Sequence, residues 1–218
     1  MNESMPIWDN LGKKSMEQGP EEGRSIDEYE KVLKFKREDL ENKFVLDLGA
    51  GPKARFSRDL EESGVKATVV SLSPEYADEQ QRKLFEPTFL DKFKMIIKNK
   101  KSEHLEVAGV GEQLPFKDES FDEVLSLFSV STWSLRNYKF WIPEICRVLK
   151  PNGAARIGPF KSPKLGPDES LEKWDKSKKW REDYIEGLGY KYEYFPGTLA
   201  REEILIISRP DADQSSKI

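Results

Sequence analysis

The feature of this sequence best suited to chemistry is an acidic residue, Asp47, which stands two residues before a glycine-rich turn. Phe44 to Leu48 is a short apolar run typical of a buried strand, and residues 49–52 (Gly-Ala-Gly-Pro) break it. Glycines at such a turn permit a sharp bend and let a ligand approach the backbone closely. The helical pattern that follows, from about Ala54 to Ser63, directs free N–H groups and a helix dipole toward that ligand. This arrangement predicts a nucleotide-like ligand over the turn.

The turn alone leaves two kinds of ligand open. Gly49, Gly51 and Ala54 also satisfy the dinucleotide fingerprint G-x-G-x-x-G/A. That fingerprint is followed, about 20 residues on, by an acid for the ribose hydroxyls. Ser71 stands at this position, and a serine cannot accept two hydroxyls as a carboxylate does. A nicotinamide oxidoreductase is therefore the weaker of the two interpretations.

The cysteine and histidine content limits the other chemistries. The one cysteine, Cys146, excludes an intramolecular disulfide framework, and its apolar helical surroundings predict a buried core thiol rather than a nucleophile. With one histidine besides, the chain lacks the usual nitrogen–sulfur ligand set, so no metal site is expected. His104 begins an expected strand, at the end away from ligand sites in parallel sheets, which favours a structural role.

The elements that must position the turn alternate between strands and helices. Expected strands cover residues 44–48, 67–72, 104–108, 121–128, 154–157, 190–195 and 203–208. Expected helices cover residues 25–40, 54–63, 75–85, 88–99, 137–149 and 171–186. Alternation of this kind predicts an α/β fold with a doubly wound, mostly parallel seven-stranded sheet. The last two strands form an antiparallel C-terminal hairpin.

Composition and charge bound the class of protein. Of the 218 residues, 37% are hydrophobic and 35% charged, and the net charge is −4, which does not favour a nucleic-acid binder. The sequence contains no run of about 18 apolar residues, so no membrane-spanning helix is predicted. The N-terminus also lacks a secretory pattern, and a cytoplasmic location is expected. We expect an irregular arm over residues 1–24, one domain over 25–209 and a disordered tail over 210–218.

Three sequence blocks, taken in order, narrow the choice of ligand. They are VLDLGAG at residues 45–51, GEQLPF running to SFDEVL at residues 111–125, and EICRVLKPNG at residues 144–153. Taken in this order and at these spacings, they resemble the class I S-adenosylmethionine-dependent methyltransferases, a Rossmann-like family. The closest likeness is to the small-molecule branch with LPF…FD and RVLKPGG blocks. The resemblance covers roughly Phe44 to Ile157.

The resemblance implies a role for each matching position. The turn holds the methionine end of S-adenosylmethionine beside Asp47, the end of the second strand meets the ribose and adenine, and the loop after the third strand borders the adenine. The implied cofactor-binding residues are Asp47, Gly49, Ala50, Gly51, Ser71, Leu72, Val110, Gly111, Glu112, Phe128 and Ser129. After the fourth strand, Thr132 and Trp133 are expected to face the substrate, with core packing as the other interpretation of Trp133. Tyr29 and Trp8 are candidates to cover the pocket.

No catalytic base is evident, and methyl transfer does not require one in every case. Displacement at an already activated sulfonium can be driven largely by positioning. The sequence thus predicts S-adenosylmethionine-dependent methyl transfer to a small molecule, since the modest charge and short extra segments favour neither nucleic acid nor membrane. It leaves the oligomeric state open.

Three departures from the family pattern support an alternative. The family's third turn glycine is replaced around Lys53. Ser71 stands where the family has the acid that binds the ribose, and Val110 stands where it has the acid that meets the adenine amino group. Hydrogen bonds to charged groups are worth about 1.5–3 kcal/mol each, so two lost carboxylates weaken the cofactor site unless other groups compensate. A degenerate, non-catalytic methyltransferase fold with a binding or regulatory role is the alternative hypothesis.

Overall fold

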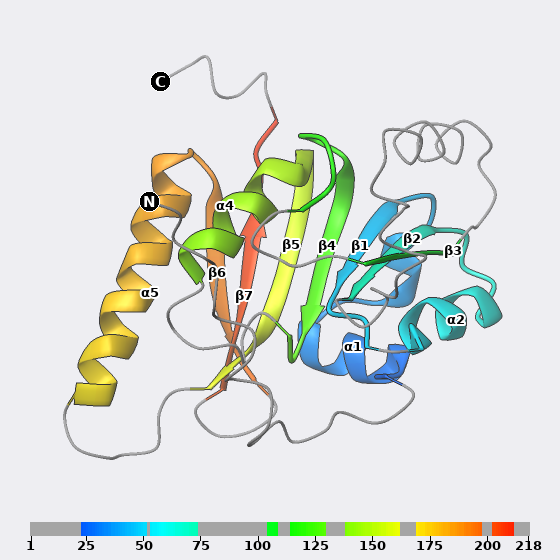
Figure 1. Ribbon diagram of the computed structural model, residues 1–218, viewed down its shortest axis with the longest axis horizontal. Coiled ribbons are helices and arrows are strands. Elements are labelled where there is room, and N and C mark those ends of the chain that lie inside the picture. Colours follow the sequence, from blue (N-terminus) through cyan, green and yellow to red (C-terminus); the bar gives the residue numbers. More distant parts are fainter. Residues whose placement is uncertain are drawn as a thin grey trace, which may run out of the picture.

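The computed structural model of the chain describes residues 23–51, 53–73, 104–108, 114–129, 138–161, 169–197 and 202–211. The expected helices at 75–85 and 88–99, and most of the expected arm, lie outside these ranges. The strands form one seven-stranded sheet in the order β3-β2-β1-β4-β5-β7-β6, with β3 at one end and β6, beside α5, at the other (Figure 1). Its strands are β1 (Phe44–Leu48), β2 (Thr68–Ser73), β3 (His104–Ala108), β4 (Phe121–Leu127), β5 (Leu149–Lys161), β6 (Lys191–Pro196) and β7 (Glu202–Ser208).

The pairing confirms the predicted doubly wound sheet. The pairs β1–β2, β2–β3, β1–β4 and β4–β5 are parallel, while β7 runs antiparallel to both β5 and β6. From β1 the chain builds the sheet outward through β2 and β3, then returns to place β4 on the other side of β1. This reversal makes a topological switch point at the carboxyl ends of β1 and β4, where ligands bind in open α/β sheets.

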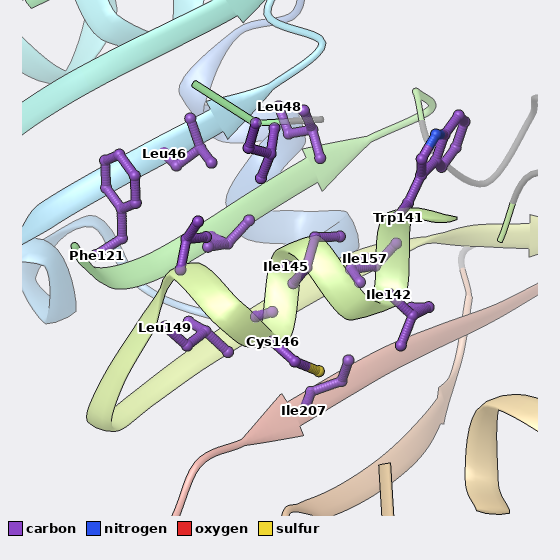
Figure 2. Close-up of a cluster of buried hydrophobic side chains, with 14 of the residues drawn as sticks. Leu46, Leu48, Phe121, Trp141, Ile142, Ile145, Cys146, Leu149, Ile157 and Ile207 are labelled. Atoms are coloured by element: carbon purple, nitrogen blue, oxygen red, sulfur yellow. The ribbon is translucent and has the colours of Figure 1, made fainter. Parts of the chain in front are cut away.

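Helices cover both faces of the sheet. Besides the short 3-10 helix η1 (Arg37–Leu40), they are α1 (Ile26–Leu33), α2 (Arg55–Glu62), α4 (Tyr138–Val148) and α5 (Glu169–Gly187). Successive residues of β1 point to opposite faces. Leu46 therefore joins a core with residues of α4, whereas Val45 joins a second core with residues of α1 and α2. Figure 2 shows α4 directing Ile142, Ile145 and Cys146 into the first core.

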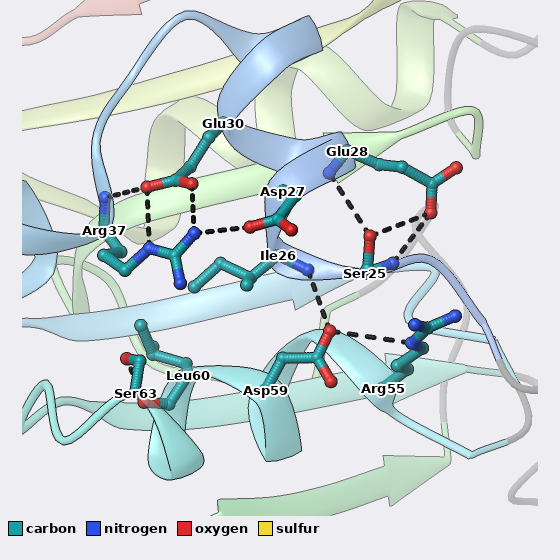
Figure 3. A network of polar contacts seen from close by, with 10 residues as sticks. All are labelled: Ser25, Ile26, Asp27, Glu28, Glu30, Arg37, Arg55, Asp59, Leu60 and Ser63. Atoms are coloured by element: carbon teal, nitrogen blue, oxygen red, sulfur yellow. Dashed lines mark hydrogen bonds and ion pairs between the residues drawn. The ribbon is translucent and has the colours of Figure 1, made fainter.

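The α1 helix is fixed at its start and tied to α2. Ser25 and Glu28 form the predicted capping box, in which each side chain accepts a hydrogen bond from the other residue's backbone N–H. The backbone N–H of Ile26 donates to Asp59 Oδ2 of α2 at 3.1 Å (Figure 3). The helix ends earlier than expected, at Leu33 instead of about Leu40, because Lys34 takes a left-handed conformation with φ 58°.

The fifth strand is longer than the sequence suggested. It begins at Leu149, which pairs with Phe121, and it runs through Pro151 to Gly153 with a register shift, where the sequence predicted a turn. A Cβ at Gly153 would lie 2.8 Å from the carbonyl oxygen of Lys150. The close backbone approach explains the glycine, and the irregular pairing explains why the local pattern resembles a turn.

Candidate functional site

The glycine turn lies at the switch point and is bound to the neighbouring strand. The backbone N–H groups of Gly49 and Ala50 donate to the carbonyl oxygen of Leu72 at 2.8 and 3.3 Å. Gly49 and Gly51 have φ values of 85° and 75°, which glycine adopts without strain. A Cβ at Gly49 would lie 2.1 Å from Ser129 Oγ, so the serine side chain occupies that space. The ends of β1, β2 and β4 thus meet at the turn.

Phe128 turns the chain as it leaves β4. Its φ of 56° ends the strand one residue before the sequence predicted, and its backbone N–H donates to the carbonyl oxygen of Gly158 at 2.7 Å. A bulky residue rarely takes this conformation, which costs on the order of 1–3 kcal/mol and is typical of functional sites. The turn brings Phe128 and Ser129, both predicted site residues, to the glycine turn.

Asp47 carries a fully buried carboxyl group near the end of β1, two residues before Gly49. Its Oδ1 accepts a hydrogen bond from the Tyr29 hydroxyl at 2.7 Å, while Oδ2 has no hydrogen-bond partner among the described residues. Burial raises the pKa of Asp47 to about 7, and the Tyr29 hydrogen bond opposes that rise. A buried carboxylate oxygen without a partner is costly, so a cation brought next to it would be stabilised.

Tyr29 has a different position from the one expected. The sequence suggested a residue covering a pocket, but Tyr29 is 2% exposed and stacks on Phe56 of α2, with ring centroids 4.4 Å apart. From this packed position its hydroxyl reaches Asp47. The ring contact therefore orients the group that holds the carboxylate.

Ser71 and Leu72 lie at the end of β2 and are both buried. The Ser71 hydroxyl is 2.7 Å from Ser57 Oγ and 3.2 Å from His104 Nε2. A hydroxyl has one donor and two acceptor positions, so these two contacts use two of the three. Leu72 directs its side chain into the first core and contributes its carbonyl oxygen to the turn. Contact of Ser71 with a ribose stays a prediction.

His104 occupies the structural place that the sequence predicted. It starts β3 in register with Val69, and its ring bonds to Ser71. Burial lowers the pKa of His104. Its contacts are those of a partly buried residue that stabilises the layer between β2, β3 and α2.

The segment 114–116 is clamped by two charged residues of α4. Glu144 accepts a hydrogen bond from the backbone N–H of Leu114 at 2.8 Å, and Arg147 donates to the carbonyl oxygens of Leu114 and Phe116 at 3.1 and 2.7 Å. The hydrogen bond from Arg147 lowers the pKa of Glu144. Two sequence blocks far apart in the chain therefore form one unit, which anchors the end of the predicted adenine loop.

Several predicted site residues lie outside the described ranges. They are Val110, Gly111 and Glu112 of the predicted adenine loop and the predicted substrate residues Thr132 and Trp133. Their roles remain predictions. In the ranges that are described, no group of three or more His, Cys, Asp or Glu residues is placed to hold a metal ion. No helix in those ranges is both long and apolar enough to span a bilayer.

Sequence reasoning missed two residues next to the turn, Gly23 and Arg24. A Cβ at Gly23 would lie 3.0 Å from the carbonyl oxygen of Ala50, and one at Gly51 would lie 3.4 Å from the Cα of Gly23. The Arg24 guanidinium lies over the Phe128 ring, 4.1 Å from its centroid. Nothing in the local pattern around residue 23 indicates this contact, because it arises only when α1 packs on the sheet.

The family comparison covers the same three sequence blocks. The sequence matches the family described as methyltransferase domain over residues 46–157. No curated protein matches the chain. Similar solved structures include a SAM-dependent methyltransferase from Methanosarcina mazei, with 16% identity, coverage of 78% of this chain and 94% of that one, and a TM-score of 0.49.

Two further solved structures are also similar to the chain. A SAM-dependent methyltransferase from Aquifex aeolicus is 16% identical, covers 84% of this chain and 95% of its own, and has a TM-score of 0.45. The [4+2]-cyclase SpnF is 13% identical, covers 86% of this chain and 80% of its own, and has a TM-score of 0.50. Likeness at such identity concerns the fold alone, and function must be argued from the site.

Proposed function

Because the chain belongs to the methyltransferase domain family, we propose that it is an S-adenosylmethionine-dependent methyltransferase acting on a small molecule. The observation that carries the proposal is the carboxylate oxygen Oδ2 of Asp47. It is buried, lacks a hydrogen-bond partner among the described residues, and lies two residues before Gly49 of the turn at the switch point of the sheet. The cofactor carries an ammonium group that would complete this oxygen's interactions.

The residues around the turn fit the cofactor. Asp47 offers an acceptor for the ammonium group, and the turn lets a ligand approach the backbone. Phe128, partly buried against the second core, lies at the end of β4 with Arg24 over its ring. When bound, S-adenosylmethionine supplies a methyl group on a positively charged sulfur. The chain's own residues hold and orient the reactants and exclude water, which can contribute much of the rate enhancement.

A small-molecule acceptor is supported by the charge of the chain. A net charge of −4 does not create the positive field that attracts nucleic acid. Incubation with S-adenosylmethionine carrying a labelled methyl group tests the acceptor class. Label should enter small-molecule fractions of a metabolite mixture; transfer only to protein or nucleic acid would overturn this part of the proposal.

Isothermal titration calorimetry with S-adenosylhomocysteine tests the cofactor site. We expect saturable binding to the wild type and weaker binding to Asp47→Asn, which keeps the shape of the side chain and removes its charge. Folding of the variant is checked by circular dichroism. Absence of binding at millimolar ligand would reject the proposal.

The second candidate is a non-catalytic binding module on the same fold. It is favoured by Ser71, whose hydroxyl already bonds to Ser57 and His104 and which provides no carboxylate for a ribose. The variant Val110→Asp, which restores the family's acid, separates the two. A gain in S-adenosylhomocysteine affinity supports the enzyme, whereas unchanged and negligible binding supports the module.

A further inference from the structure

Arg24 is held at the candidate site by contacts on both of its sides. The preceding residue, Gly23, rests on Ala50 and Gly51 of the turn. The Arg24 guanidinium lies 4.1 Å from the centroid of the Phe128 ring, at the end of β4. The residue after it, Ser25, caps α1. A cation is thereby positioned where the carboxyl ends of β1 and β4 meet.

The present partner of Arg24 is weak and replaceable. Arg24 pairs with Glu28 at 3.3 Å, and these side chains are 28% and 43% exposed. A partly exposed pair four residues apart contributes little, because solvent screens the attraction and both side chains lose freedom. A guanidinium has five N–H donors in a planar fork that matches a carboxylate, so a ligand carboxylate at this place would compete well.

The α1 helix helps to position both charged groups beside the turn. The residues immediately before α1 include Arg24, and within the helix Tyr29 holds the Asp47 carboxyl. A negative group thus lies at the end of the strand that leads into the glycine turn, and a positive group lies at the rim of the turn. An α-amino acid carries one ammonium and one carboxylate on a single carbon, and the two charges of the site are complementary to it.

We propose that Arg24 is a cofactor-binding residue that pairs with the carboxylate of S-adenosylmethionine, while Asp47 receives its ammonium group. The inference rests on the proposed function and identifies how the site selects the amino-acid end of the cofactor. It predicts preference for S-adenosylhomocysteine over 5′-methylthioadenosine, which has the nucleoside and sulfur but no amino acid.

Calorimetry with these two ligands tests the proposal on the full chain. Arg24→Ala should weaken S-adenosylhomocysteine binding about 10- to 100-fold, the range for a lost hydrogen bond between charged groups, and leave 5′-methylthioadenosine binding within about twofold. Arg24→Lys should lie between, since it keeps the charge and loses the fork. Lys179→Ala is the matched control: it also removes a cation from a pair four residues apart, but Lys179 is 75% exposed on α5, pairs with Asp183 at 3.0 Å and should leave both affinities unchanged.

A second measurement changes the ligand instead of the protein. Wild-type affinity for decarboxylated S-adenosylhomocysteine should fall by the same factor as Arg24→Ala costs with the full ligand, and the variant should not distinguish the two ligands. If the wild type binds S-adenosylhomocysteine but Arg24→Ala binds it equally well, or the decarboxylated ligand binds as tightly, the role of Arg24 is refuted and the proposed function stands. If the wild type does not bind S-adenosylhomocysteine, both are refuted.

Discussion

Asp47 shows how one residue can be costly for folding and useful for binding. Its carboxyl group is fully buried, and only one of its oxygens is hydrogen-bonded within the described residues. Burial raises its pKa to about 7. An ionised carboxylate there is unfavourable until a cation arrives, so a positively charged ligand gains binding energy by relieving that cost.

The stability of the protein should depend on pH through this residue. Because the pKa of Asp47 rises from 3.8 to about 7 on folding, the native state holds a proton that the unfolded state has released. Its contribution therefore declines as the pH rises across that window and is constant above it. Asp47→Asn has no such titration. The free energy of unfolding of the variant minus that of the wild type should therefore be larger at about pH 8 than at about pH 5, by a few kcal/mol.

Urea unfolding of both proteins at those two pH values measures this gain. Tyr29→Phe serves as a second variant, since loss of the hydrogen bond that favours the ionised form should extend the decline to higher pH. Parallel pH dependence of the wild type and Asp47→Asn would contradict the buried position of the carboxyl group.

A comparison of Gly49 with Gly64 separates the cost of a left-handed backbone conformation from the cost of a steric clash at Cβ. Both have positive φ, 85° and 82°, but a Cβ at Gly49 would lie 2.1 Å from Ser129 Oγ whereas one at Gly64 would meet no atom within 4 Å. Gly64→Ala should cost about 1–2 kcal/mol, the price of a left-handed conformation. Gly49→Ala should cost more and also weaken ligand binding, because the ends of β1 and β4 must separate.

Chemical denaturation of the two variants compares these costs. Ser129→Gly combined with Gly49→Ala should recover part of the loss, since it removes the clashing side chain. Equal costs at both positions would show that Ser129 does not pack against the turn.

At the scale of elements, α4 carries out two tasks. Its apolar residues fill the first core. The side chains of its polar residues Glu144 and Arg147 hold the segment 114–116 by hydrogen bonds to the backbone of that segment. Because this segment directly follows the predicted adenine loop, the position of α4 on the sheet also sets one end of that loop. Packing and a candidate binding function are thereby linked in one helix.

Removal of the Arg147 side chain should loosen this segment. Arg147→Ala loses the bonds to two carbonyl oxygens and leaves Glu144 without its cation, so the free energy of unfolding should fall by about 2–3 kcal/mol. Exchange of the Leu114 amide hydrogen, which Glu144 protects, should become faster. Urea unfolding and hydrogen-exchange mass spectrometry measure the two effects.

Lys179→Ala provides the matched control. It also removes a cation from a helix, but the Lys179–Asp183 pair is exposed on α5, with side chains 75% and 58% exposed. We expect no measurable change in the unfolding midpoint. Unchanged Leu114 exchange in Arg147→Ala would contradict the clamp.

At the scale of the whole molecule, the sheet separates two cores that must form together. Leu46 and Leu48 of β1 face the core under α4, while Val45 of the same strand faces the core under α1 and α2. Neither core can be lost without exposing β1 and its neighbours. The glycine turn at the end of β1 is therefore supported from both faces, which keeps the site rigid.

Cys146 reports on this cooperativity. It is buried in the first core, and burial raises the pKa of its thiol to about 12. The thiol should not react with a disulfide reagent at neutral pH in native buffer, and its reaction in urea should follow global unfolding. Absorbance assays of thiol labelling measure this, with one thiol per chain in denaturant as the reference. Rapid labelling of the native protein would show that α4 opens independently.

The sequence by itself determined the order of the elements, the parallel sheet with its antiparallel end, the glycine turn and the core position of Cys146. These follow from local signals: alternation of apolar residues, helix caps and the conformational freedom of glycine. Its errors fell where backbone conformation depends on distant contacts. Lys34 ends α1 early, and the fifth strand begins at Leu149, before the expected turn, because Leu149 already pairs with Phe121 of β4.

Only the tertiary structure decided which side chains meet at the turn. Tyr29 reaches Asp47, Gly23 rests on Gly51, and Ser71 bonds to His104, although each pair is distant in sequence and has no periodic signal. Such contacts depend on how helices pack across the sheet. Local propensity can place Asp47 before a glycine turn, but the burial that changes its pKa and the position of Arg24 over Phe128 arise when separate segments are brought together.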